Sequence, residues 1–288
     1  MKLTGISIRK LEEDVFKVLM RLATSIVIGS LVLIIGIVAI KGYSSLNIDM
    51  LTQTPKGGYY LGKSGGILNA IVGSLYVGLG ATLLAMMISL PVVLYVNVFV
   101  GPRSLIARIV RFTIDLLWGV PSIVYGAFGF ILMLFLGMRA SLGAAIITVA
   151  FLELPVMVRA MDEVVRMVPV EIAEASYGLG ATRLETAFKV IVRQTMPGLI
   201  TAVLIAFGRG IGDTASVLFT AGFTDRIPTS LGDPAATLPL AIFFQLGTPY
   251  PAVQGRAYAA AAVLTLIVLS VSIASRLISR YFARNTVE

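Results

Sequence analysis

Long apolar runs separated by short polar segments dominate this chain of 288 residues. A helix of about 20 apolar residues crosses a bilayer core about 30 Å thick. Six stretches reach that length: residues 22–40, 64–102, 116–138, 140–158, 197–220 and 257–275. The pattern predicts an all-α membrane protein, a polytopic bundle of six transmembrane helices.

The second run, residues 64–102, is long enough to be either one helix bent near Pro91 or two short spans. The distribution of Lys and Arg decides between these, because cytoplasmic loops carry an excess of both. With six spans and a cytoplasmic N-terminus, 16 of the 23 basic residues face the cytoplasm, six face the other side and Arg209 lies in the membrane. Splitting the run reverses this bias. We therefore expect six spans. The chain would lie in the inner or plasma membrane of the cell, with both termini in the cytoplasm.

This topology divides the chain into a cytoplasmic N-terminal segment (1–21), a transmembrane domain (22–282) and a cytoplasmic tail (283–288). The first run is too long for the apolar core of a signal peptide, about 7–15 residues, and Glu12, Glu13 and Asp14 interrupt its flank. We interpret it as an uncleaved anchor helix.

The only sizeable cytoplasmic segment is residues 159–196. Its apolar residues recur at three- and four-residue steps on either side of Gly178 and Gly180. This spacing predicts two short amphipathic helices joined by a glycine turn. A surface helix without special function would show the same pattern.

Composition agrees with a membrane protein: 57% of residues are hydrophobic, 13% are charged and the mean hydropathy is +0.93. The net charge of +8 does not indicate nucleic-acid binding, because the basic residues lie between the apolar runs. The chain has no Cys and no His, which excludes disulfides, thiolate or imidazole metal sites and His-based catalysis. We expect no catalytic residue and no metal site.

Residues 57–64 match the phosphate-loop pattern G-x-x-x-x-G-K-[ST]. That loop functions between a buried strand and a helix of a nucleotide-binding domain, with an acidic strand nearby. Here the string lies in a short loop between two predicted spans, on the side away from the cytoplasm. We expect a polar entry to the next helix and no ATP binding.

Four ionisable residues fall inside or at the edge of predicted spans: Glu153, Arg159, Arg209 and Asp213. A charge at the bilayer centre costs about 2.5–3.5 kcal/mol or more, so it normally faces a pore or a partner. Arg209 falls near the midplane of the fifth run, and Asp213 would lie one helical turn further on the same face. One interpretation is an internal ion pair that holds helices together. The other is a cationic site for an anion, since a guanidinium donates parallel hydrogen bonds to an oxyanion.

The string Glu171-Ile-Ala-Glu174-Ala175-Ser176-Tyr-Gly-Leu-Gly180 resembles the EAA loop of ABC importer permeases, with Ser176 in place of the second alanine. The resemblance implies a MetI-like ABC permease fold in which this loop is the coupling helix that docks into a groove of a cytoplasmic ATPase. It assigns coupling to Glu171, Glu174, Ala175, Ser176 and Gly180.

The run 208–221, with 238–243, 155–159 and 65–67, resembles the A-type permease subunits of phosphate-specific (Pst) importers over about residues 15–282. Relatives usually carry Glu where this chain has Asp213. The resemblance implies a phosphate permease working by alternating access, with Arg159 and Arg209 on the phosphate path beside Asp213 and Glu153.

The partners so implied are a second, PstC-type permease, two PstB-type ATP-binding subunits that hold ATP and Mg, a PstS-type phosphate-binding protein outside the cell, and membrane lipids. The chain itself would carry no cofactor, perform no catalysis and bind no nucleic acid. Three alternatives remain: a permease for sulfate or molybdate, a membrane enzyme of lipid phosphates, and a phosphate-sensing subunit that does not conduct.

Overall fold

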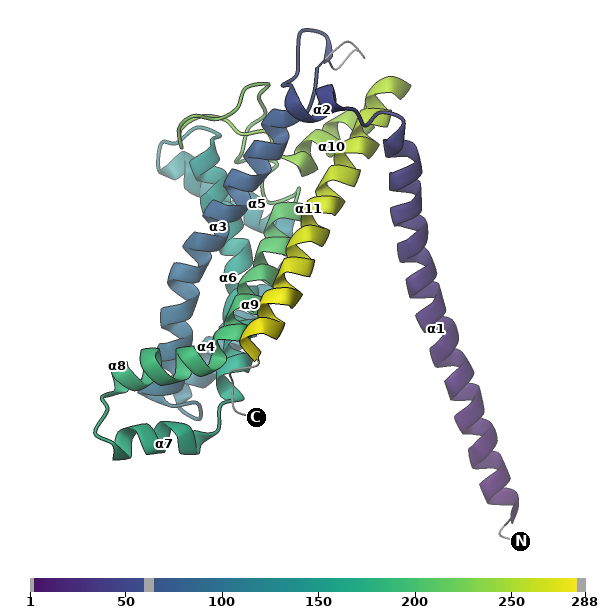
Figure 1. Ribbon diagram of the computed structural model, residues 1–288. Coiled ribbons are helices and arrows are strands. Elements are labelled where there is room, and N and C mark those ends of the chain that lie inside the picture. Colours follow the sequence, from purple (N-terminus) through teal and green to yellow (C-terminus); the bar gives the residue numbers. More distant parts are fainter. Residues whose placement is uncertain (1–2, 60–64, 284–288) are drawn as a thin grey trace.

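The computed structural model describes residues 3–59 and 65–283, and the described part contains helices and loops but no β-strand. Figure 1 shows the helices as a bundle with one long helix set apart. The α-helices are α1 (Leu3–Tyr43), α2 (Ile48–Thr52), α3 (Leu68–Leu94), α4 (Leu105–Trp118), α5 (Ser122–Phe135), α6 (Leu142–Arg166), α7 (Val170–Gly178), α8 (Arg183–Glu185), α9 (Val192–Gly212), α10 (Leu238–Leu246) and α11 (Pro251–Ala283). Two π-helical segments, η2 (Tyr95–Val100) and η3 (Thr186–Ile191), continue α3 and precede α9.

Five helical stretches are long and apolar enough to cross a membrane: Arg9–Tyr43, Leu68–Val100, Leu142–Arg166, Arg183–Gly212 and Pro251–Ile278. The pair α4 and α5 gives a sixth span if it is counted as one. The second apolar run is a single helix that continues through Pro91, as the charge distribution favoured. The chain is thus a multi-pass helical membrane protein, and the prediction of six spans is met with the bent pair included.

The third span differs from the prediction of one helix over 116–138. Helix α4 begins earlier, at Leu105, and α4 and α5 meet at an angle of 102°. Pro121 has no N–H to donate to the preceding turn, and its ring disfavours helical geometry at Val120. The helix therefore ends at Trp118 and a new one starts at Ser122.

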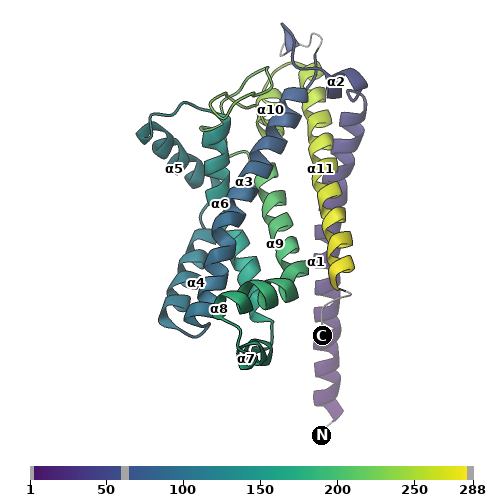
Figure 2. The same cartoon turned by 60° about the vertical axis from the view of Figure 1, so that its left-hand side comes forward.

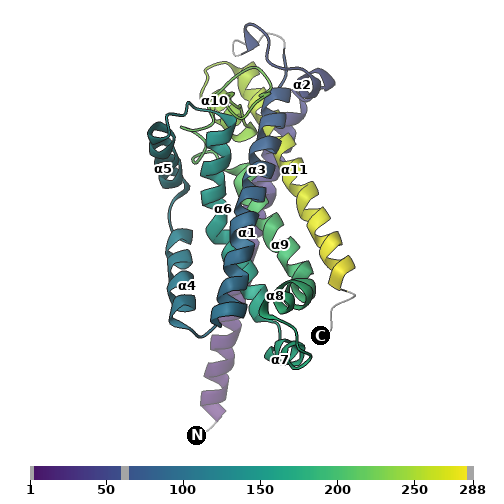
Figure 3. The same cartoon turned by 90° about the vertical axis from the view of Figure 1, so that its left-hand side faces the viewer.

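The core of the bundle consists of α3, α6 and α9, which lie side by side in Figure 3. Small residues let these helices approach closely: Ala81, Ala145 and Ala206 are fully buried. Gly78 in α3 lies against Phe207 and Ile211 in α9. Such small-residue contacts are the usual basis of helix packing in lipid, where apolar burial alone drives little association.

Helix α1 diverges from the bundle in Figure 1, and in the view of Figure 2 it lies behind α11. Its main packing partner is α11, which it meets at its C-terminal end, where Gly42 lies against the backbone of Tyr258 and Ala259. From Arg9 onward, most of its remaining apolar surface is exposed in the isolated chain.

The predicted pair of short helices after α6 is confirmed only for its first member, α7. The second part, α8, does not end as a short helix. It continues through η3 into α9, so that Arg183–Gly212 forms one long helical stretch that includes Pro197. The glycine break is real: Gly180 has φ +84°, a backbone geometry that side chains with a Cβ avoid.

Candidate anion pathway and coupling helix

Arg209 lies in the last turn of α9, which ends at Gly212. The expected continuation of this helix to residue 220 is wrong, because Asp213 adopts an extended conformation and caps the helix end. Its Oδ2 atom accepts a hydrogen bond from the backbone N–H of Ser216 at 2.7 Å, a local turn that competes with helix. Asp213 therefore does not lie one helical turn beyond Arg209 on the same face.

The guanidinium of Arg209 makes no hydrogen bond and no ion pair within the described part of the chain. The expected Arg209–Asp213 pair is absent from the described residues, and Arg209 interacts electrostatically with Tyr125 in α5. The C-terminal end of a helix carries partial negative charge, which stabilises a cation there. Arg209 thus remains partly exposed with its donors available.

Glu153 lies near the middle of α6 and is fully buried. It faces Gly210 of α9 so closely that a methyl group on Gly210 would overlap the carboxylate. Neither carboxylate oxygen has a hydrogen-bond partner among the residues that the structure describes, although the Thr82 hydroxyl of α3 lies near enough to interact electrostatically. The structure therefore places Glu153 at the contact of α3, α6 and α9, beside the last turn that carries Arg209.

Arg159 lies six residues further along α6, or about 9 Å at 1.5 Å per residue. Its Nη1 atom is 2.9 Å from Oδ1 of Asp115, and its Nε atom is 2.9 Å from Oε1 of Glu163. The sequence did not predict the contact with Asp115. Arg159 is therefore held between two carboxylates, and Arg209 is not.

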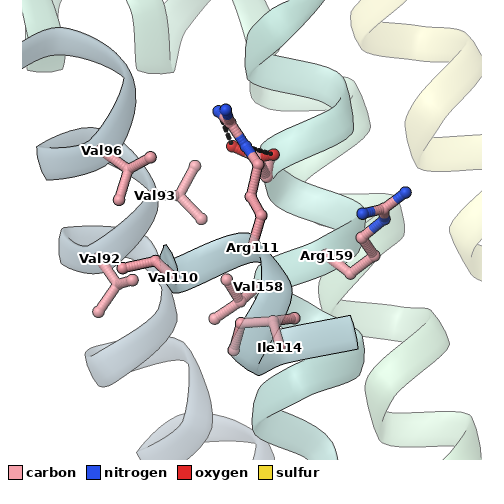
Figure 4. A pocket seen from close by; sticks show the side chains of 9 residues that line it. Val92, Val93, Val96, Val110, Arg111, Ile114, Val158 and Arg159 are labelled. Carbon is pink, nitrogen blue, oxygen red and sulfur yellow. Dashed lines mark hydrogen bonds and ion pairs between the residues drawn. The ribbon is translucent and has the colours of Figure 1, made fainter. Parts of the chain in front are cut away.

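A second ionic cluster, which the sequence did not reveal, joins η2, α4 and α6. Arg111 binds Asp162 through Nε at 2.8 Å and through Nη2 at 3.0 Å (Figure 4). Asn97 donates to the same carboxylate at 2.7 Å, and Arg111 also donates to the Pro102 carbonyl at 2.6 Å. Arg111 and Asp162 are 51 residues apart in the sequence, so no local pattern predicts that they pair.

The predicted coupling residues lie on and just after α7. Glu171, Glu174 and Ala175 are exposed, whereas Ser176 is buried and its hydroxyl lies 2.9 Å from that of Thr186 in η3. This contact fastens α7 to the segment that continues into α9.

The start of the segment that continues into α9 is held in place by two further sets of contacts. Thr182 and Glu185 form a capping box, in which each side chain binds the other's backbone N–H. Arg183 donates to the Phe99 carbonyl of η2 at 2.6 Å. A displacement of α7 would therefore be transmitted both to α9 and to the end of the α3–η2 helix.

The phosphate-loop-like string lies partly outside the described residues, which omit 60–64. Tyr59 within it is almost fully buried, and Arg256 of α11 lies over its ring, 4.5 Å from the centroid. The described part of the string thus packs against the helices around it.

Comparison with known proteins places this arrangement in a class. Residues 94–287 match the family described as the binding-protein-dependent transport system inner membrane component. The chain belongs to this family of ABC transporter permease subunits.

Its relatives include the phosphate transport system permease protein PstA of Haemophilus influenzae, which is 33% identical over 82% of this chain and 83% of that protein. The PstA of Mycobacterium leprae is 32% identical over 92% of this chain and 88% of that protein. Among solved structures, an inward-facing form of the MetNI methionine ABC transporter aligns with a TM-score of 0.59, covering 75% of this chain and 95% of that one. At 22% identity that last likeness shows the fold alone.

Proposed function

We propose that this chain is the permease subunit of an ATP-driven ABC importer that moves inorganic phosphate across the cytoplasmic membrane. The observation that carries the proposal is the unpaired guanidinium of Arg209 at the end of α9, among apolar helices of a chain whose relatives are phosphate permeases. A tetrahedral oxyanion suits this group because its planar fork donates parallel hydrogen bonds. In this proposal the chain conducts phosphate and does not itself break a covalent bond.

Alternating access would expose Arg209 first to one side of the membrane and then to the other. Phosphate leaving Arg209 toward the α7 end of the bundle reaches Arg159 next. There it must compete with Asp115 and Glu163 for the guanidinium, and because both of these carboxylates are more than half exposed the competition is weak. Arg159 therefore suits a step of transient binding and release.

We assign α7 and both termini to the cytoplasmic side, where the excess of Lys and Arg lies. Large apolar side chains around the glycine turn are exposed: Leu179 is 90% exposed, and Leu184 and Phe188 are more than half exposed. Such a patch on an amphipathic helix suits insertion into a groove of an ATPase. The two ATPase subunits, of the PstB type, would hold ATP and Mg, since this chain is proposed to carry no cofactor.

The remaining partners follow from the proposed importer. A second permease subunit of the PstC type would complete the pathway, covering the faces of α5 and α1 that are exposed in the isolated chain. A PstS-type binding protein would deliver phosphate on the opposite side from α7.

ATP-dependent uptake of radiolabelled phosphate into vesicles containing the complete complex tests the proposal. Arg209→Ala should lower uptake at least about tenfold, because hydrogen bonds to a charged group contribute about 1.5–3 kcal/mol each. Arg193→Ala, an exposed arginine on the same helix, is the matched control and should leave uptake unchanged. Near-normal uptake by Arg209→Ala, or equal competition by sulfate, would refute the assignment.

A further inference from the structure

An open cavity of about 470 Å³ lies between α7 and the rest of the bundle. Its walls come from η2 and the loop after it, the end of α6, the first two turns of α7 and the end of η3. Ala173 and Tyr177 form the α7 side. The volume falls within the range of about 300–1,000 Å³ that small-molecule sites occupy.

The cavity carries net positive charge. Arg103 and Arg166 line it, and neither makes a hydrogen bond or an ion pair with any residue that the structure describes. Asp162 lies close enough to Arg166 to interact with it electrostatically, but Arg111 already binds the Asp162 carboxylate through two hydrogen bonds. Two guanidiniums therefore face a cavity without a free counter-charge among its lining residues.

The remaining lining is mostly apolar, including Val98, Val165 and Ile191. Charged hydrogen-bond donors beside apolar walls suit an amphiphilic ligand with an anionic headgroup. Basic pockets between helices at the cytoplasmic face are typical sites for anionic lipid headgroups. The same two guanidiniums suit free phosphate equally well.

We propose that this cavity binds a phosphate group, presented either by an anionic lipid headgroup or by inorganic phosphate, through Arg103 and Arg166. The site is separate from the proposed transport path. Arg159 does not line it, and instead lines a small, mostly apolar cavity together with Arg111 and Asp162.

A ligand in this cavity would touch α7 and the ends of η2 and α6 at once. The binding site itself does not depend on the proposed importer function.

The test uses the complete complex and the double variant Arg103→Gln/Arg166→Gln, with Arg193→Gln as the exposed-arginine control. In one arm, complexes from phosphatidylcholine nanodiscs with or without phosphatidylglycerol are analysed by native mass spectrometry for retained phosphatidylglycerol. In the other arm, binding of radiolabelled phosphate is measured without ATP, in an Arg209→Ala background that removes the main phosphate-binding group of the proposed transport path.

Each basic residue near an anionic lipid surface contributes about fivefold in affinity, so the double variant should lose about 30-fold in one arm. The arm that shows the loss identifies the source of the phosphate group. Unchanged binding in both arms overturns the site, as does an equal loss in Arg193→Gln. Because neither arm involves transport, this failure is distinct from near-normal uptake by Arg209→Ala, which would overturn the proposed function instead.

Discussion

Replacing Asp162 with Ala should destabilise the chain strongly, because it leaves Arg111 charged and without its partner inside the protein. The two side chains are only 6% and 16% exposed, and the pair is made through two hydrogen bonds. Removing one member of such a pair costs about 3–5 kcal/mol of the free energy of unfolding. For a chain of this size that corresponds to roughly 10 °C in the midpoint of thermal unfolding.

The single tryptophan of the chain, Trp118, is the last residue of α4 and so reports on the helix that carries Arg111. Its fluorescence during heating of the purified chain in detergent, without the other subunits, measures the loss. Glu163→Ala is the matched control, because Glu163 is the next residue in the sequence and also pairs with an arginine, but is 60% exposed. That variant should lose at most about 1 kcal/mol. If Asp162→Ala is no less stable than Glu163→Ala, the Arg111–Asp162 pair is not a structural contact between α4 and α6.

Three further changes test other parts of the molecule. Gly180→Ala should cost about 1–2 kcal/mol at its φ of +84° and lower phosphate uptake per ATP, whereas Gly178→Ala, with open space around it, should change neither. Asp115→Asn removes one competitor for Arg159, so uptake measured against phosphate concentration should show a KM lowered a few-fold; an unchanged KM would argue against transient binding there. Hydrogen bonds from the Thr229 backbone and side chain lower the pKa of Asp233 from 3.8 to about 2. The ionised Asp233 carboxylate therefore stabilises the 229–233 turn fully above pH 3.8. This stabilisation is lost as the pH falls toward 2. The protection of the amides of that turn against hydrogen exchange, taken relative to the intrinsic rate at each pH, should fall over this range in the wild type but not in Asp233→Asn.

The positions of most spans and of α7 were predictable from sequence because their signals are local. Apolar length and the distribution of Lys and Arg identified the single long α3–η2 helix. The periodicity and glycines of residues 171–180 identified α7 and the turn at Gly180. These features depend on residues a few positions apart, which a sequence displays directly.

The errors at span ends also have local causes that hydropathy does not register. Val120–Pro121 breaks the third span, although both residues are apolar and add to the run. Asp213 ends α9 by bonding to Ser216, so the apolar residues after it belong to turns. The number of apolar residues in a run measures its preference for lipid. Backbone hydrogen bonds decide at which residue the helix ends.

The sequence by itself determined that the chain is a multi-pass helical membrane protein, which segment extends from the bundle as α7, and which ionisable residues lie among apolar ones. Only the tertiary structure decided their partners: Arg159 is held by Asp115 and Glu163, Glu153 faces Gly210, and Arg209 pairs with no carboxylate of the described residues. The physical reason is that burial depends on the neighbouring few residues of one helix, whereas a charge pair depends on how separate helices are rotated and packed against one another.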